Sequence, residues 1–265
     1  MTRPDATLAG VTVLVTRPAG QGENLCRAVE AAGGTAVHVP VITIQPLEGE
    51  QLERELRQAV SCSGGILFVS RSAVAGALAL LGRDAAVFAG KQVYAAGAGT
   101  RRALQEQGID ARAGADATRA SEALLELPEL AAANVAGRDF ALLRGEGGRE
   151  LLAEELQRRG ARVHVVELYR RARPEVTPQQ MHALWRDTRP DVVVITSATG
   201  LYNLAAMTAA EDMPVLLRAG LVVMSERIAA AAAGLGFECK PVIAAVASDA
   251  GLLEAVMACT EWKRQ

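Results

Sequence analysis

Small polar residues follow several short apolar runs in this sequence, and each introduces an Ala- and Leu-rich stretch typical of a helix. The backbone N–H groups and the dipole at the start of a helix attract anions, and neighbouring hydroxyl or guanidinium groups add donors. The residues of this kind that we single out are Thr16, Arg17, Ser70, Gly97, Thr100, Arg144, Gly145, Ser197 and Ser225. Each Ser or Thr could simply cap its helix. Together they predict a crevice that binds a ligand with several negative charges.

Tyr169 is one of only three tyrosines, and it stands in the run Glu-Leu-Tyr-Arg-Arg. A phenol beside cations can donate a hydrogen bond or a proton at neutral pH, because the reference pKa of tyrosine is about 10. A half-buried tyrosine on a strand fits the same pattern, so the residues alone leave both roles open. His38 and His164 lie on two similar extended segments. No carboxylate pairs with them in the sequence pattern, and we interpret them as structural.

Two glycine clusters, Gly97–Gly99 and Gly145–Gly147, are comparable with the dinucleotide-binding pattern. Both fail it, because Arg102 and Glu150 stand where the pattern requires a third small residue. The sequence contains no GxxxxGK[ST] phosphate-binding loop. Its four cysteines and three histidines are isolated and lack the paired spacing of zinc sites. We therefore expect neither a nucleotide cofactor nor a metal.

The composition indicates a globular protein of two domains that holds its ligand through local groups. The chain has 265 residues, 22% charged and 3% aromatic, with a net charge of −2. Nucleic-acid-binding domains usually carry a basic face and stacking aromatics, so we expect no nucleic-acid partner. The longest apolar run, Ala73–Leu81, is far shorter than the roughly 20 residues that cross a bilayer. With no apolar signal core at the N-terminus, we expect a cytoplasmic protein without a membrane segment.

Seven short apolar runs alternate with helical stretches along the chain. The runs are Val11–Val15, Ile66–Val69, Val93–Ala96, Phe140–Leu143, Val192–Ile195, Leu221–Met224 and Val242–Val246. Continuous apolar strands alternating with helices are typical of parallel sheets covered on both faces. In such open α/β sheets, ligands bind outside the carboxyl ends of the strands, which is where the candidate residues stand. The sequence thus predicts an α/β fold that gathers those residues at the sheet edges.

Two longer extended segments interrupt this alternation: Val37–Ile44 and Val163–Arg171. Each follows a helical stretch and leads into a turn that contains a proline, Pro46 or Pro174. They could be connectors between two domains, in which case residues 46–162 form one domain. They could equally be ordinary sheet strands, and periodicity alone does not decide between the two interpretations.

Several motifs in the right order and spacing resemble those of the uroporphyrinogen-III synthase family. They are Val13–Gln21, Pro40–Ile42, Leu143–Leu152, Glu167–Arg171, Ile195–Ser197 and Ser225–Ile228. The similarity extends from about residue 10 to residue 257. Ser70 matches less well, because the family often has a Thr-Ser pair where this chain has Val69 and Ser70.

The resemblance implies two flavodoxin- or Rossmann-like α/β domains joined by a two-stranded connector. One domain would comprise residues 1–37 and 174–265, the other residues 46–162, with connectors at 38–45 and 163–173. The family acts as a monomer and uses no metal or organic cofactor. A transient contact with the deaminase that supplies its unstable substrate is also expected.

The resemblance further implies the reaction. Hydroxymethylbilane, a linear tetrapyrrole with eight carboxylates, would bind between the domains, lose its hydroxyl group as water and close to uroporphyrinogen III with ring D inverted through a spiro intermediate. Tyr169 would help the hydroxyl group leave. Thr100, Ser197 and Ser225 match family positions near the cleft and would donate hydrogen bonds to the substrate. Arg17 and Arg144 would contact its carboxylates or form structural ion pairs.

Two other functions fit part of the sequence. A non-catalytic two-domain protein that binds small anions would share the crevice donors, although such proteins are usually exported and the sequence shows no signal. A nucleotide-dependent transferase would share the sheet topology, but the incomplete glycine patterns argue against it.

Overall fold

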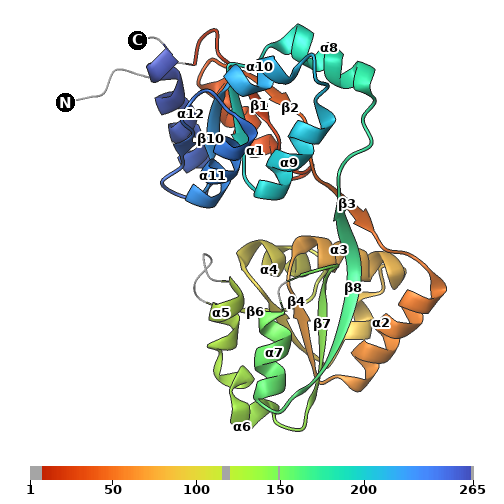
Figure 1. The fold of residues 1–265 in the computed structure, drawn as a ribbon. Helices are drawn as coiled ribbons and strands as arrows, with labels where there is room; N and C mark the ends of the chain where they lie inside the picture. The colour runs from red at the N-terminus through yellow and green to blue at the C-terminus, as the bar shows by residue number, and fades with distance from the viewer. Residues whose placement is uncertain (1–7, 115–119, 149, 264–265) are drawn as a thin grey trace. The chain divides into compact units, whose positions relative to one another are not determined.

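The chain divides into two units in the computed structural model, which describes residues 8–114, 120–148 and 150–263 (Figure 1). Unit 1 contains the described residues of 1–43 and 172–265, and unit 2 those of 44–171. Unit 1 is therefore discontinuous in sequence, and unit 2 is inserted into it. Each unit has its own sheet and its own apolar cores.

The sheet of unit 1 is parallel, in the order β11-β10-β9-β1-β2. Its strands are β1 (Thr12–Val15), β2 (Thr35–His38), β9 (Val192–Ile195), β10 (Gly220–Val223) and β11 (Val242–Ile243). The central strands are continuous apolar runs because both faces of the sheet are covered. Val13 and Val15 point to one face and Leu14 to the other, as the two-residue period of a strand requires.

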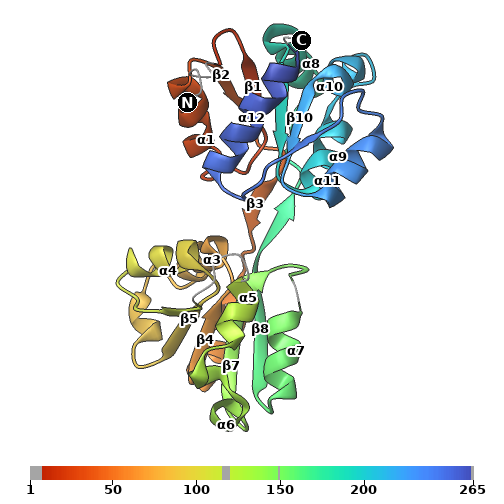
Figure 2. The same ribbon diagram turned by 90° about the vertical axis from the view of Figure 1, so that its left-hand side faces the viewer.

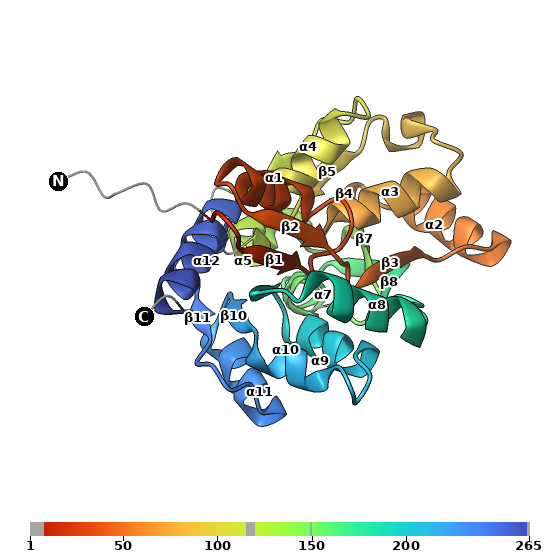
Figure 3. The ribbon, with the colours of Figure 1, turned by 90° about the horizontal axis from the view of Figure 1, so that it is seen from above.

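Helices pack on both faces of this sheet. On one side lie α1 (Glu23–Ala31) and α12 (Asp249–Lys263). On the other lie α8 (Pro178–Thr188), α9 (Ala198–Met207), α10 (Met213–Arg218) and α11 (Glu226–Leu235). Figure 3 shows these two layers, with α1 and α12 together and α9, α10 and α11 across the sheet from them.

The sheet of unit 2 has the order β3-β8-β7-β4-β5-β6. Its strands are β3 (Thr43–Pro46), β4 (Gly65–Phe68), β5 (Gln92–Ala95), β6 (Arg112–Ala113), β7 (Asp139–Gly145) and β8 (Arg162–Ala172). All the pairs from β8 to β6 are parallel. The predicted α/β class with parallel sheets is confirmed.

Unit 2 is also covered on both faces. One face packs against α2 (Glu50–Cys62), α3 (Arg71–Leu80) and α4 (Ala98–Gln105). The other packs against α5 (Ala120–Leu125), α6 (Ala132–Val135) and α7 (Leu151–Arg158), and Figure 2 shows α5 and α7 beside β7 and β8. Two short 3₁₀ helices, η1 (Ala85–Phe88) and η2 (Pro128–Leu130), complete the unit. None of the helices among the described residues has the length and apolar character needed to cross a membrane.

The segments expected as connectors are for the most part sheet strands. Of residues 163–173, those up to Ala172 belong to β8, which pairs with β7 in parallel from Arg162 to Tyr169 and reaches the boundary between the units at Arg171 and Ala172. In the other segment, 38–45, the ends belong to β2 and β3, which leaves only residues 39–42 outside a strand. Polar and apolar residues alternate in β8 because this strand, next to the edge strand β3, is covered less completely than the central strands. A connector between domains can show the same alternation, so the sequence alone does not distinguish the two.

Candidate active site

A pair of hydroxyl groups lies at the carboxyl ends of the strands in unit 2. Ser70 follows β4 and caps α3, where its Oγ accepts a hydrogen bond from the backbone N–H of Ala73 at 3.1 Å. The same Oγ lies 2.9 Å from the Oη of Tyr169, on β8. The two residues are 99 positions apart in the sequence, so the parallel sheet brings them together.

A β-bulge aims Tyr169 at Ser70. Arg144 of β7 pairs with Glu167, but the next residue, Gly145, pairs with Tyr169, so Leu168 is an extra residue in β8. A bulge of this kind bends the strand and redirects its side chains. As a result, the consecutive residues Leu168 and Tyr169 are both buried in the core beneath α2, α3 and α4.

Gly145 makes room for the tyrosine ring. A Cβ atom at this position would lie 2.5 Å from Cζ of Tyr169 and 2.9 Å from its Oη. The guanidinium carbon of Arg171 lies 5.8 Å from the centre of the same ring, on its face. Gly145, which we expected at a ligand, is thus placed against a protein side chain.

Arg144 is buried and already paired with carboxylates of the protein. Its Nη2 donates to Glu150 at 2.8 Å and to Glu167 at 3.2 Å, and its Nη1 to the carbonyl oxygen of Gly148 at 3.4 Å. The hydrogen bond from Arg144 lowers the pKa of the Glu150 carboxyl. The Nε of Arg144 is buried without a hydrogen-bond partner in the described part of the chain. The pairing of Arg144 with these two glutamates has no signature in the sequence, because their distances from Arg144 depend on the loop and the neighbouring strand.

The starts of α3 and α4 lie close together at this end of the sheet. Gly97 caps α4 with a φ of 130°, a backbone conformation that favours glycine, and Thr100 is buried in the first turn. A Cβ on Gly99 would lie 3.7 Å from the side chain of Arg71, the first residue of α3. Arg71 is exposed and adjoins both helix starts, so it is a further candidate anion ligand that the motifs did not single out.

In unit 1, Thr16 and Arg17 follow β1 and are held by other parts of that unit. The Thr16 hydroxyl donates to the carbonyl oxygen of Val194 at 2.7 Å, so its single proton is used within the sheet. Arg17 forms an ion pair with Asp249 at the start of α12. The carbonyl oxygen of Arg17 also lies 2.8 Å from Nε2 of His38, which supports the structural role expected for this histidine.

Ser197 and Ser225 occupy equivalent places at the starts of α9 and α11, but their hydroxyl groups differ. The Oγ of Ser197 accepts a hydrogen bond from the N–H of Gly200 at 3.0 Å, as a capping serine does. Ser225 caps its helix without such a side-chain bond. Both residues are half-buried, and Ser225 has more hydrogen-bonding capacity left for a ligand.

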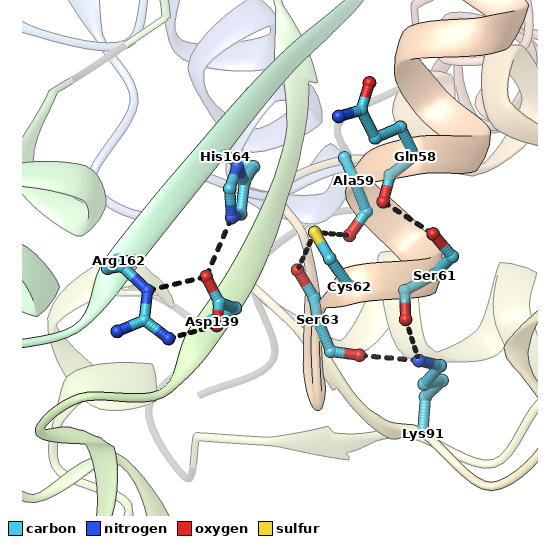
Figure 4. A network of polar contacts seen from close by, with 9 residues as sticks. All are labelled: Gln58, Ala59, Ser61, Cys62, Ser63, Lys91, Asp139, Arg162 and His164. Carbon is cyan, nitrogen blue, oxygen red and sulfur yellow. Dashed lines mark hydrogen bonds and ion pairs between the residues drawn. The ribbon is translucent and has the colours of Figure 1, made fainter.

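A second polar cluster lies at the opposite, amino ends of the strands in unit 2 (Figure 4). Asp139, the first residue of β7, accepts hydrogen bonds from Arg162 and lies 3.0 Å from Nε2 of His164. These contacts hold the pKa of Asp139 well below its usual range. His164 therefore does have a carboxylate partner, contrary to the sequence pattern. Nearby, Lys91 donates to the carbonyl oxygens of Ser61 and Ser63.

In the described part of the chain, one group of side chains has the composition of a weak metal site. The ligating atoms of His182, Glu211 and Asp212 lie within 4.8 Å of one another. They adjoin a cavity of about 410 Å³ whose lining includes Asp191 and Ala219, the residues before β9 and β10. This cavity is at the amino ends of the strands of unit 1, whereas the candidate residues of this unit lie at the carboxyl ends.

The sequence matches the family model described as uroporphyrinogen-III synthase HemD over residues 23–254. A uroporphyrinogen-III synthase from Salmonella typhimurium is 36% identical over 235 residues, which cover 86% of this chain and 93% of that protein. The chain belongs to the uroporphyrinogen-III synthase family.

A second relative supports this assignment, and a solved structure shares the fold. The uroporphyrinogen-III synthase of Escherichia coli is 33% identical over 234 residues, covering 86% of this chain and 93% of that protein. The crystal structure of the Helicobacter pylori uroporphyrinogen-III synthetase has the same fold, with a TM-score of 0.63 at 12% identity over 94% of this chain and 99% of that one. The family predicted from the motifs is confirmed.

Proposed function

We propose that this member of the family cyclises hydroxymethylbilane to uroporphyrinogen III, with inversion of ring D and loss of water. The match to family members over nearly their whole length carries the proposal. The hydrogen-bonded hydroxyl pair of Ser70 and Tyr169 supports it, because departure of a hydroxyl group as water needs a proton. The sequence has no nucleotide-binding motif that would indicate a different reaction.

The reaction begins at the hydroxymethyl carbon of ring A. Its C–O bond breaks, the oxygen leaves as water, and the pyrrole becomes an electrophilic azafulvene. Ring D attacks through its substituted carbon, and the resulting spiro-pyrrolenine reopens and closes with ring D inverted. We propose Tyr169 as the source of the proton that lets the oxygen leave as water. Because the substrate also closes spontaneously to the type I isomer, the protein must impose one geometry as well as accelerate ionisation.

The substrate carboxylates would be held by donors at the helix starts. In unit 2, these are the backbone N–H groups from Ala98 to Thr100, with Arg71 beside them. The N–H of Gly97, which we also expected at the ligand, already donates to the carbonyl oxygen of Ala95 at 2.8 Å. In unit 1, they are the starts of α9 and α11, at Ser197 and Ser225. Many backbone donors suit a substrate with eight carboxylates, since each helix start binds an anion without needing a basic side chain.

We also propose Arg17 and Arg144 as ligands of substrate carboxylates, provided that the substrate can displace their present partners. Each already pairs with a protein carboxylate, Asp249 or Glu150, so a substrate carboxylate must displace that partner. Glu150 is about half exposed, which makes such an exchange sterically accessible for Arg144. We also propose that the protein works as a cytoplasmic monomer and contacts, transiently, the deaminase that supplies its substrate.

A coupled isomer assay tests the proposed function. Purified protein is added to porphobilinogen and its deaminase, the products are oxidised, and type I and type III uroporphyrins are separated by chromatography. We expect mostly type III, with no metal or nucleotide added. Type I alone, from protein shown to be folded, would contradict the proposal and favour an anion-binding protein without this activity.

A further inference from the structure

Tyr169 is too deeply buried in unit 2 to be the group that first meets a ligand. It is 2% exposed, and its hydroxyl group lies against Ser70. Ser70 is only half-buried and stands at the start of α3, at the carboxyl edge of the sheet. Of the two hydroxyl groups, that of Ser70 is therefore the more accessible, and Tyr169 lies behind it.

The hydrogen bonds of Ser70 indicate which of the two hydroxyl groups donates to the other. A serine hydroxyl has one proton to donate and two lone pairs to accept with. One lone pair of Ser70 accepts the backbone N–H of Ala73. If the other accepts the phenol proton of Tyr169, at 2.9 Å, the acceptor capacity is full and the Ser70 proton is free to point away from both partners. In this arrangement both hydroxyl protons point toward the accessible side.

Two close backbone approaches fix this geometry. A Cβ on Gly145 would lie 2.5 Å from the tyrosine ring, so the ring rests directly on β7. A Cβ on Gly76, in α3, would lie 3.0 Å from the carbonyl oxygen of Leu168, so α3 packs closely on β8 next to Tyr169. The helix that carries Ser70 and the strand that carries Tyr169 are thereby held in one register.

We propose that Ser70 is the catalytic residue that touches the leaving hydroxyl group, and that Tyr169 supplies the proton through it. The inference rests on the proposed function and gives it a proton path. As the C–O bond of the substrate breaks, its electron pair stays on oxygen. The Ser70 proton passes to that oxygen to form water, and the Tyr169 proton passes to Ser70. The phenolate recovers a proton when the last pyrrole ring loses one at the end of the cyclisation, so the cycle is balanced.

Four variants separate this relay from a purely structural pair. Ser70→Ala removes the hydroxyl group and the cap, whereas Ser70→Thr keeps both. Ser70→Asn keeps a capping oxygen but cannot relay a proton, so it tests the relay even if Ser70→Ala folds poorly. Tyr169→Phe removes the proton source. Thr177→Ala is the matched control, because Thr177 also caps a helix with its side chain but belongs to unit 1 and is not among the candidate residues.

The measurement is the initial rate of type III formation from preformed hydroxymethylbilane. The rate of spontaneous type I formation in the same sample serves as the internal reference. We expect Ser70→Ala, Ser70→Asn and Tyr169→Phe each to lower kcat by about 100-fold, with KM changed less than about threefold. The double variant Ser70→Ala/Tyr169→Phe should be no slower than either single variant, because both break one path. Ser70→Thr and Thr177→Ala should stay within about threefold of the parent protein.

Two results would overturn the relay while leaving the proposed function intact. In one, Ser70→Asn or Ser70→Ala keeps the parent kcat while Tyr169→Phe loses it, so that Tyr169 meets the substrate directly. In the other, the losses of the two single variants multiply in the double variant, so that the residues act independently. Failure of the parent protein to make type III would instead overturn the proposed function and the relay with it.

Discussion

The ring of Tyr169 packs directly against the backbone of Gly145, which is possible because glycine has no side chain. The tyrosine ring occupies the space where a Cβ of Gly145 would stand. Its hydroxyl group meets Ser70 only because the bulge at Leu168 turns it toward α3. The requirement for glycine at this position therefore comes from the protein's own side chain, and anion binding is not needed to explain it.

Gly145→Ala should separate these roles. The added methyl group must push the ring of Tyr169 away, which lengthens its contact with Ser70 and costs about 1–3 kcal/mol of stability through overpacking. We expect kcat to fall toward that of Tyr169→Phe while KM changes little. Gly234→Ala is the control, because a Cβ there meets nothing within 4 Å. A rise in KM without a fall in kcat would show that Gly145 acts on the substrate instead.

At the scale of the elements, each helix start offers donors, but the side chain at the cap decides how many remain free. Ser197 uses its Oγ to satisfy the N–H of Gly200, whereas Ser225 makes no such bond. A helix start whose serine does not cap has its hydroxyl group available in addition to its backbone N–H groups. α9 and α11 thus differ in what they can offer a carboxylate.

Replacing Ser197 by alanine should mainly affect stability, whereas replacing Ser225 should mainly affect substrate binding. Ser197→Ala should lower the free energy of unfolding by about 1 kcal/mol, since a capping hydrogen bond is lost. Ser225→Ala should change it by less than about 0.5 kcal/mol. If Ser225 donates to a substrate carboxylate, its loss should raise KM by about twofold to tenfold. Urea unfolding and steady-state kinetics on both variants measure this, and equal destabilisation would contradict the distinction.

The sequence predicted the elements better than their contacts. Apolar runs such as Val192–Ile195 identify buried parallel strands, and the small residues after them lie where helices begin at the carboxyl ends of those strands. The bulge at Leu168 has no such signature, because both Leu168 and Tyr169 are residues that either face of a strand accepts. Without the bulge, the approach of Tyr169 to Ser70 could not be predicted. The partners of the arginines were equally hidden, since Arg17 meets a carboxylate 232 positions away.

For the whole molecule, the discontinuous unit 1 depends on segments from both ends of the chain. β1 pairs with β9, almost 180 residues later, and Asp191 accepts a hydrogen bond from the backbone of Thr12. Unit 2 closes its sheet from residues nearer in sequence, with Asp139 at the start of β7 bound to residues at the start of β8. Because Asp139 must be ionised to form these contacts, we expect their contribution to stability to depend on pH.

Asp139→Asn should reveal that dependence. Arg162 and His164 hold the pKa of Asp139 below its ordinary value of 3.8, so the charged carboxylate is favoured in the folded state. A carboxyl group with a lowered folded pKa stabilises the protein above its unfolded pKa and loses that contribution as the pH falls through the folded pKa. The variant should therefore unfold at a lower temperature than the parent protein at neutral pH. The difference should shrink below about pH 4, where the unfolded carboxyl is protonated. Circular dichroism melts at several pH values measure it, and a difference that stays constant down to about pH 2 would mean that Asp139 acts through packing instead of charge.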